Sequence, residues 1–126
     1  MNGLIDDVFV LDTNTVINHL RTDGGEIHLG DCLISVITEM EAMAKPKLSL
    51  EEEQRIRNFL SGVSIIPLTD EIKREAILIR RSGTPRPKLP DAIVAATAVI
   101  LGAKLVTADG DLSRLSWPSL SVVAPL

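Results

Sequence analysis

Short apolar runs alternate along the chain with longer segments in which apolar residues recur at helical spacing. The runs are rich in valine, isoleucine and leucine, a composition that predicts buried β-strands. We expect strands at 8–11, 32–35, 63–68, 104–107 and 120–123. Strands that alternate with helices form parallel sheets covered on both faces. The pattern therefore predicts one α/β domain over residues 1–126.

Polar caps and helix breakers predict where the helices begin and end. The expected starting residues are Asp12, Thr13 or Asn14 for the first helix, Ser35 for the second, Ser49 with Glu52 for the third, Thr69 or Asp70 for the fourth, and Pro90 for the fifth. A turn is expected at 22–25, and Gly102 is expected to end the fifth helix. That helix is apolar on nearly all sides, which is typical of a helix buried between layers.

The same spacing predicts which helix residues face the core. The expected inner residues of the second helix are Ile37, Met40, Glu41 and Ala44. Glu39 is rotated from Glu41 by about 200° and is expected to be exposed. The expected inner residues of the fourth helix are Ile72, Ala76 and Ile79, with Leu78 as a further candidate. One more helical turn is expected at 112–115.

Composition narrows the class of protein and of partner. The chain has 126 residues, of which 45% are hydrophobic, enough for one domain to bury a core without metals or disulfides. Phe9, Phe59 and Trp117 are its only large aromatic residues, which disfavours nucleic-acid binding by base stacking. A net charge of −4 gives no general electrostatic attraction to nucleic acid.

The expected location is the cytoplasm. Cys32 is the single cysteine, so no disulfide forms within the chain, and a reducing compartment is favoured. Asp6 and Asp7 stand where a signal peptide would carry basic residues. The longest apolar run, 92–101, is too short to span a bilayer.

Four carboxylates are expected to meet at one edge of the sheet. Asp12 follows the first strand and Asp109 the fourth, Asp91 lies in the first turn of the buried helix, and Glu41 lies on the second helix. In open α/β sheets, ligands bind between the carboxyl end of a strand and the following helix, which is where Asp12 is expected. An inward glutamate and an aspartate at the head of an apolar helix are costly unless they are paired, coordinated or protonated.

Each of these acids also has an ordinary structural explanation. Asp12 can cap a helix, Asp91 can stabilise a helix N-terminus, Asp109 can be a turn residue, and Glu41 can be an exposed helical glutamate. Gathered together, however, they would raise one another's pKa unless a divalent cation offset their charge. All-oxygen ligation suits Mg²⁺ or Mn²⁺ and not zinc, and the two histidines lack ligand-like spacing.

A basic stretch departs from the acidic balance of the chain. The segment from Ile72 to Leu89 contains only one acid, Glu75, and six basic residues: Lys73, Arg74, Arg80, Arg81, Arg86 and Lys88. This pattern is explained either by a solvated helix face that runs into a loop or by a local surface for phosphates or an acidic partner.

Four short motifs resemble the successive motifs of PIN-domain nucleases. They are Leu11-Asp12-Thr13-Asn14, the segment from Ser35 to Glu41, the segment from Leu89 to Ala96, and Thr107-Ala108-Asp109. In this order, and over essentially the whole chain, they are most similar to the VapC toxins of type II toxin–antitoxin pairs. The resemblance implies a five-stranded parallel sheet of order 3-2-1-4-5 in a three-layer α/β/α fold, a homodimer, and inhibition by a cognate antitoxin.

The resemblance also implies roles for individual residues. The acids that match the family's pattern, and that would bind Mg²⁺ or Mn²⁺ and cut RNA, are Asp12, Glu41, Asp91 and Asp109. Supporting polar residues are expected at Thr13 or Asn14, Ser35 and Thr107, with Asp111 as a further candidate. Many toxins of the family have an asparagine at the first acid of Ala108-Asp109-Gly110-Asp111, so the choice between Asp109 and Asp111 as fourth ligand stays open.

The expected function is that of a Mg²⁺-dependent endoribonuclease. The resemblance implies that the protein is the toxin of a VapBC-type pair and that its substrate is tRNA or rRNA. One or two metal ions would activate a water molecule and stabilise charge on the phosphate. The basic residues expected to guide the RNA backbone are Arg80, Arg81, Arg86 and Lys88.

Three other functions are weighed against this one. A haloacid-dehalogenase-like phosphatase would use Asp12 as its nucleophile, but it wants a second aspartate where the chain has Asn14. A receiver-type signalling domain wants a phosphoacceptor at the end of the third strand, which ends in Pro67-Leu68. A non-catalytic PIN-fold binding module is the third, and the retained acids argue against it.

Overall fold

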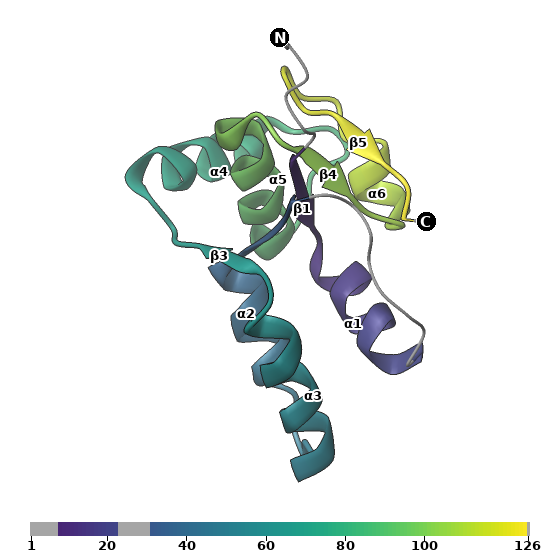
Figure 1. The fold of residues 1–126 in the computed structure, drawn as a ribbon. Coiled ribbons are helices and arrows are strands. Elements are labelled where there is room, and N and C mark those ends of the chain that lie inside the picture. The colour runs from purple at the N-terminus through teal and green to yellow at the C-terminus, as the bar shows by residue number, and fades with distance from the viewer. Residues whose placement is uncertain (1–7, 23–30, 126) are drawn as a thin grey trace, which may run out of the picture.

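A parallel sheet forms the middle layer of the protein. The computed structural model describes residues 8–22 and 31–125, so the turn expected at 22–25 lies almost wholly outside the described residues. The strands are β1 (Val8–Leu11), β2 (Asp31–Ser35), β3 (Ser64–Ile66), β4 (Lys104–Val106) and β5 (Val122–Val123). They pair in parallel in the order β3-β2-β1-β4-β5, which confirms the predicted fold class and strand order (Figure 1).

Strand β1 lies at the centre of the sheet. In register, Val10 stands between Leu33 of β2 and Leu105 of β4. Successive residues of a strand face opposite sides, so Val10 packs into one core and Leu11 into the other. Both residues are fully buried, as a central parallel strand requires.

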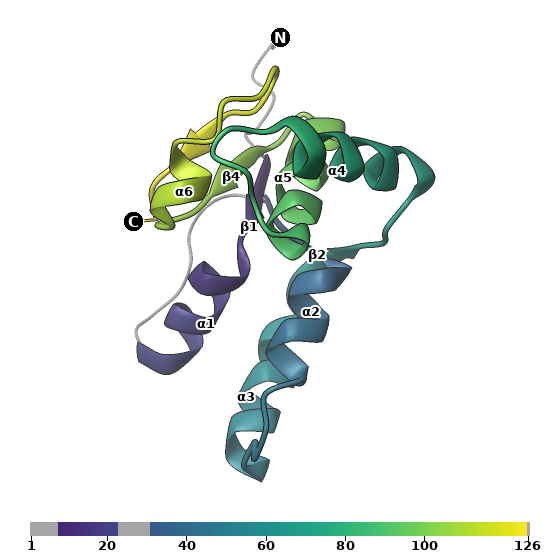
Figure 2. The ribbon, with the colours of Figure 1, turned by 180° about the vertical axis from the view of Figure 1, so that it is seen from behind.

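Helices cover both faces of the sheet. They are α1 (Thr13–Thr22), α2 (Val36–Met43), α3 (Leu50–Leu60), α4 (Asp70–Ser82), α5 (Leu89–Leu101) and α6 (Gly110–Ser113). The core around Val10 includes α4 and α5, whereas the core around Leu11 includes Val16 of α1 and Phe59 of α3. Helices α2 and α3 run side by side away from the sheet (Figures 1 and 2).

Local sequence signals predicted the helix ends well. Ser35 and Thr69 cap α2 and α4 with their side chains, and Ser49 and Glu52 form the predicted capping box of α3. Gly102 ends α5 in the left-handed conformation, with φ of 65°. No helix within residues 8–22 and 31–125 is long and apolar enough to cross a membrane.

The predicted inner face of α2 is confirmed at Ile37, which packs against the core, and is wrong at the other three residues. Its buried residues are Thr38 and Ala42, whereas Met40 is 57% exposed and both Glu41 and Ala44 are exposed. Helix α2 extends beyond the sheet, so its buried side is set by α1, α3 and α5 as well as by the strands. The apolar spacing of the segment alone does not contain that information.

Smaller differences concern element lengths. Strand β3 ends before Pro67, which lacks the N–H that a further parallel pairing would use. Helix α6 begins at Gly110 and not at Leu112, because Asp109 caps it. Leu78, the further candidate for the inner face of α4, is 46% exposed.

We expect Gly83→Ala to destabilise the fold, because Gly83 is buried where α4 meets the C-terminal segment. A Cβ atom there would lie 2.7 Å from the Ile79 carbonyl oxygen and 2.9 Å from Leu115 Cδ1. The backbone carbonyl has no freedom to rotate away, so the free energy of unfolding should fall by about 1–3 kcal/mol in chemical denaturation.

Gly62→Ala is the matched control for this substitution. Its Cβ would meet the Phe59 carbonyl oxygen at an ordinary 3.6 Å, so the stability should change by less than about 0.5 kcal/mol. Equal losses in the two variants would contradict the close packing at Gly83.

Candidate active site

Asp12 is a buried carboxylate that accepts hydrogen bonds from two neighbouring parts of the chain. It directly follows β1 and is only 2% exposed. Its Oδ1 accepts a hydrogen bond of 2.7 Å from the Thr15 N–H, which caps α1, and its Oδ2 accepts one from the Thr107 hydroxyl. One oxygen of Asp12 therefore caps α1, as the structural explanation expected. The other oxygen accepts from Thr107, the residue that follows β4.

Thr107 connects Asp12 to Asp109. The Thr107 hydroxyl is buried and also accepts the Asp109 N–H at 2.9 Å. The Asp109 carboxylate in turn accepts the Leu112 N–H at 2.9 Å and so caps α6. The chain after β4 is thus held against the end of β1, and Asp109 is a cap residue and not merely a turn residue.

Glu41 is held in place by hydroxyl groups of two helices. The Thr13 hydroxyl donates to Glu41 Oε1 at 2.7 Å and lies 3.0 Å from the Thr38 hydroxyl. Because an ionised carboxylate only accepts, the Thr13 proton points to Glu41, and Thr38 is left to donate to Thr13. Glu41 is exposed, whereas it was predicted to face the core. The hydrogen bond from Thr13 nevertheless fixes the orientation of its carboxylate.

Thr38 is a residue that the sequence analysis did not single out. It is fully buried, and it lies three positions before Glu41 on α2. Residues at that spacing are neighbours on one helix face, so the spacing from a candidate acid was the available signal.

The charges of the other three acids act on Asp91. It lies in the first turn of α5 and is half-buried. Burial raises the pKa of Asp91, and the charges of Asp109, Glu41 and Asp12 raise this pKa further, while Lys88 lowers it. The other three acids are therefore close enough to Asp91 to act on it electrostatically.

Other predicted site residues lie apart from this cluster or have structural roles. Asn14 is exposed. Asp111 is exposed and forms a 2.8 Å ion pair with Arg114. Ser35 is buried and caps α2 by accepting the Ile37 N–H at 3.1 Å.

The acids fit a hard divalent cation by their chemistry. Within residues 8–22 and 31–125, none of the four carboxylates forms an ion pair with a lysine or arginine. Carboxylate oxygens are the donors that Mg²⁺ and Mn²⁺ prefer. As the side chains stand, the described residues contain no group of three acids, histidines or cysteines arranged to hold a metal ion. Binding would therefore require side-chain adjustment around the fixed carboxylate of Asp12.

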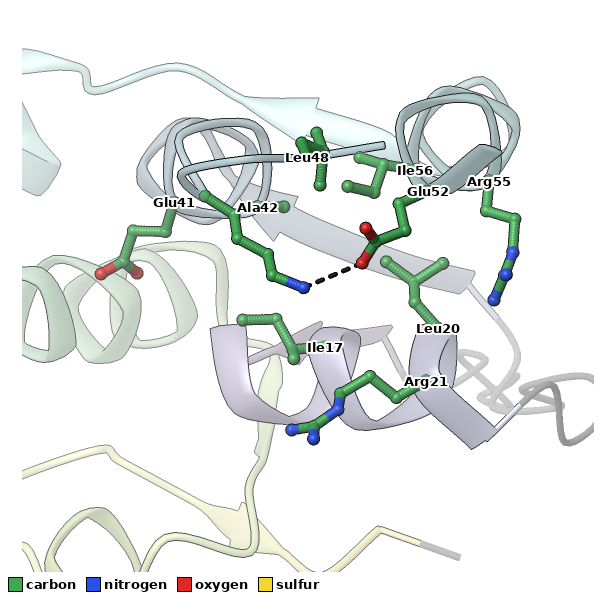
Figure 3. A pocket seen from close by; sticks show the side chains of 10 residues that line it. Ile17, Leu20, Arg21, Glu41, Ala42, Leu48, Glu52, Arg55 and Ile56 are labelled. Carbon is green, nitrogen blue, oxygen red and sulfur yellow. Dashed lines mark hydrogen bonds and ion pairs between the residues drawn. The ribbon is translucent and has the colours of Figure 1, made fainter. Parts of the chain in front are cut away.

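A groove of about 450 Å³ lies beside the cluster, between α1, α2 and α3 (Figure 3). Glu41 stands at one end, and apolar residues such as Ile17, Leu20 and Ile56 line the groove. Toward the other end, the Lys45 ammonium donates to Glu52 at 2.8 Å and lowers the pKa of Glu52 to about 2. The groove thus has an apolar lining, a charged rim and direct access to one acid of the cluster.

Comparisons with known proteins give one family and a set of similar structures. A family model described as the PIN domain matches residues 9–118. A toxin–antitoxin complex from Klebsiella pneumoniae contains a chain that is 31% identical, with 93% of this chain and 97% of that chain covered and a TM-score of 0.69. No curated protein sequence matches this chain.

Two further structures are similar at lower identity and support the fold. DNA-bound VapBC from Salmonella typhimurium contains a chain with a TM-score of 0.77 and 23% identity, covering 94% of this chain and 98% of that one. VapBC2 from Rickettsia felis, bound to promoter DNA, gives a TM-score of 0.74 and 18% identity, covering 93% and 98%.

We expect Thr107→Val to cost about 1–3 kcal/mol in the free energy of unfolding. The substitution keeps the shape but leaves the buried Asp12 Oδ2 and the Asp109 N–H without their partner. Chemical denaturation measures the loss.

Thr97→Val is the matched control, since Thr97 is equally buried. Its hydroxyl donates only to the Ile93 carbonyl of the same helix, so its loss should be nearly neutral. If the two valine variants were equally stable, the proposed importance of the Thr107 hydroxyl would be refuted.

Asp91→Asn should raise the melting temperature of the metal-free protein by a few degrees at pH 7. The raised pKa of Asp91 means that the folded state holds this proton more tightly than the unfolded state. Stability is therefore lost as the pH rises through the pKa of the folded state, and asparagine removes that loss. The gain should shrink toward about pH 3, where aspartate is largely protonated in both the folded and the unfolded state.

Asp70→Asn provides the comparison, because Asp70 is also a first-turn aspartate but is exposed and lies beside Lys73. It should lower the melting temperature slightly or leave it unchanged. A gain for Asp70→Asn as large as that for Asp91→Asn, or one that ignores pH, would contradict this account.

Proposed function

The chain belongs to the PIN-domain family, and from this we propose that it is a Mg²⁺- or Mn²⁺-dependent endoribonuclease. The observation that carries the proposal is the mutual influence of four carboxylates at one edge of the sheet. The charges of Asp12, Glu41 and Asp109 act on the half-buried Asp91, and the described lysines and arginines form no ion pair with any of the four. Such an arrangement is costly for the fold and suits a bound cation.

Asp12, Glu41, Asp91 and Asp109 would hold one or two divalent ions. A bound ion would lower the pKa of a coordinated water and stabilise negative charge on the phosphate. The chain's own contribution is positioning. Thr15 and Thr107 fix the Asp12 carboxylate before anything binds, and the Thr13 hydroxyl orients Glu41. Offsetting the acidic charge also lets an RNA phosphate approach.

We further propose that the protein is the toxin of a VapBC-type pair, acts on tRNA or rRNA, and works as a homodimer. The toxin assignment is supported by the 31% identity to a chain of a toxin–antitoxin complex over nearly the full length of both. A segment of the antitoxin would find an apolar surface in the groove between α1, α2 and α3, next to Glu41.

The residues after Asp12 weigh against the phosphatase alternative. A haloacid-dehalogenase-like phosphatase wants a second acid two residues after its nucleophilic aspartate, and an amide cannot serve as that acid. Asn14, which stands where such enzymes have a second aspartate, is exposed.

Purified protein should cleave single-stranded RNA with Mg²⁺ or Mn²⁺ and stop when EDTA is added. Asp12→Asn and Asp91→Asn should each lower the cleavage rate by more than about a hundredfold, because each removes a metal ligand. Asp109→Asn should cost more than Asp111→Asn, since Asp111 is paired with Arg114.

Metal binding has a second readout that does not depend on activity. Mg²⁺ should raise the melting temperature of the wild-type protein and of Asp70→Asn, but not that of Asp12→Asn. Cleavage that survives EDTA, or that survives both Asp12→Asn and Asp91→Asn, would refute the proposed function.

A further inference from the structure

A second hollow, of about 340 Å³, lies where the end of α4 meets the start of α5. Its lining consists of Ile77, Arg80, Arg81, Arg86 and Leu89, and we call it the arginine hollow. The arginines come from the last turns of α4 and from the loop that follows, so the fold gathers lining residues that are spread over the thirteen positions 77–89.

The three arginines share this hollow without a carboxylate partner among the described residues. By contrast, Arg55, Arg57 and Arg114 each form an ion pair with a nearby acid. Glu75, the one acid of the basic stretch, accepts the Trp117 indole N–H at 2.7 Å. Like charges gathered in one place repel, so the hollow favours an anionic ligand.

The apolar members of the hollow narrow the kind of anion. Ile77 is 45% exposed and Leu89 is 51% exposed, although both are large hydrophobic residues. A simple anion gains nothing from such side chains, whereas a nucleotide offers a phosphate for a guanidinium and a flat, weakly polar base for an aliphatic surface. Arginine also stacks on bases. An unstacked base is available in a single strand and not within a duplex, and RNA is the nucleic acid of the proposed function.

The hollow and the carboxylate site share the N-terminal end of α5. Leu89 begins the helix and Asp91 lies two residues later in the same turn, rotated by about 200°, so the two sites lie on different sides of the helix start. Lys88, which was expected to share this surface, does not line the hollow, and its charge acts instead on Asp91. A single RNA strand held in the hollow could reach the acids by passing across the N-terminal end of α5, a span of about 10 Å, which is the diameter of a helix.

We propose that the arginine hollow binds a nucleotide of single-stranded RNA that flanks the phosphate to be cut. This inference rests on the proposed nuclease function and adds to it a site for the substrate outside the carboxylate cluster.

The test measures binding of a fluorescent single-stranded RNA oligonucleotide to the full chain in EDTA, at several salt concentrations. The double variant Arg81→Gln/Arg86→Gln should weaken binding about tenfold at low salt and reduce the slope of log Kd against log salt by about 1.4. Leu89→Ala should weaken binding several-fold and leave that slope unchanged. Arg74→Gln is the control, because it removes one arginine charge from α4 outside the hollow, against two in the double variant, and should have little effect.

Cleavage with Mg²⁺ then separates this inference from the function on which it rests. The hollow variants should raise KM and keep kcat near the wild-type value. If the wild type cleaves RNA and the hollow variants bind and cleave RNA equally well, the proposed RNA binding by the arginine hollow is refuted and the nuclease function stands. If Arg74→Gln is as damaging as the double variant, or a polyglutamate peptide of equal charge competes as well as RNA, a nucleotide site is likewise overturned. A wild type that neither binds nor cleaves RNA overturns both.

Discussion

The Asp12 carboxylate is the point from which the geometry of the site follows. A buried charge is tolerated only when its oxygens are satisfied, and here one oxygen accepts the Thr15 N–H in the first turn of α1 while the other accepts the Thr107 hydroxyl. This requirement fixes α1 and the end of β4 relative to β1. Thr107 carries the constraint on to Asp109, which caps α6. The structural and functional explanations of Asp12 are therefore compatible, because each carboxylate oxygen that accepts one hydrogen bond keeps a second lone pair for a ligand.

Asp91 shows the cost of such a site. Its carboxylate is partly removed from water and faces three other acids, so the folded protein is penalised for its charge. The helix behind it compensates, since α5 buries a run of alanine and valine side chains in the main core. A destabilising group on a well-packed helix is what selection for a ligand, and not for stability, would leave in place.

Much of this could be predicted from local signals in the sequence. Strand β1, the caps at Ser35, Ser49 and Thr69, and the end of α5 at Gly102 each depend on neighbouring residues only, and these predictions are confirmed. The buried face of α2 could not be predicted, because it depends on which helices pack around a segment that extends past the sheet. Thr38 was missed for the same reason, because its hydrogen bond with Thr13 requires α1 to lie beside α2.

Charge illustrates the limit of composition most clearly. The net charge of −4 argues against nucleic-acid binding by the molecule as a whole. Three of the seventeen acids, however, lie on α3, where Glu51 and Glu53 are paired with arginines. Exposed charges are screened beyond about 8 Å at physiological salt, so a polyanion responds to the local surface it meets. Around the start of α5 that surface changes from arginines to carboxylates within a few residues. A cation bound by the acids would make this whole edge attractive to phosphate, which joins the two halves of the proposed substrate path.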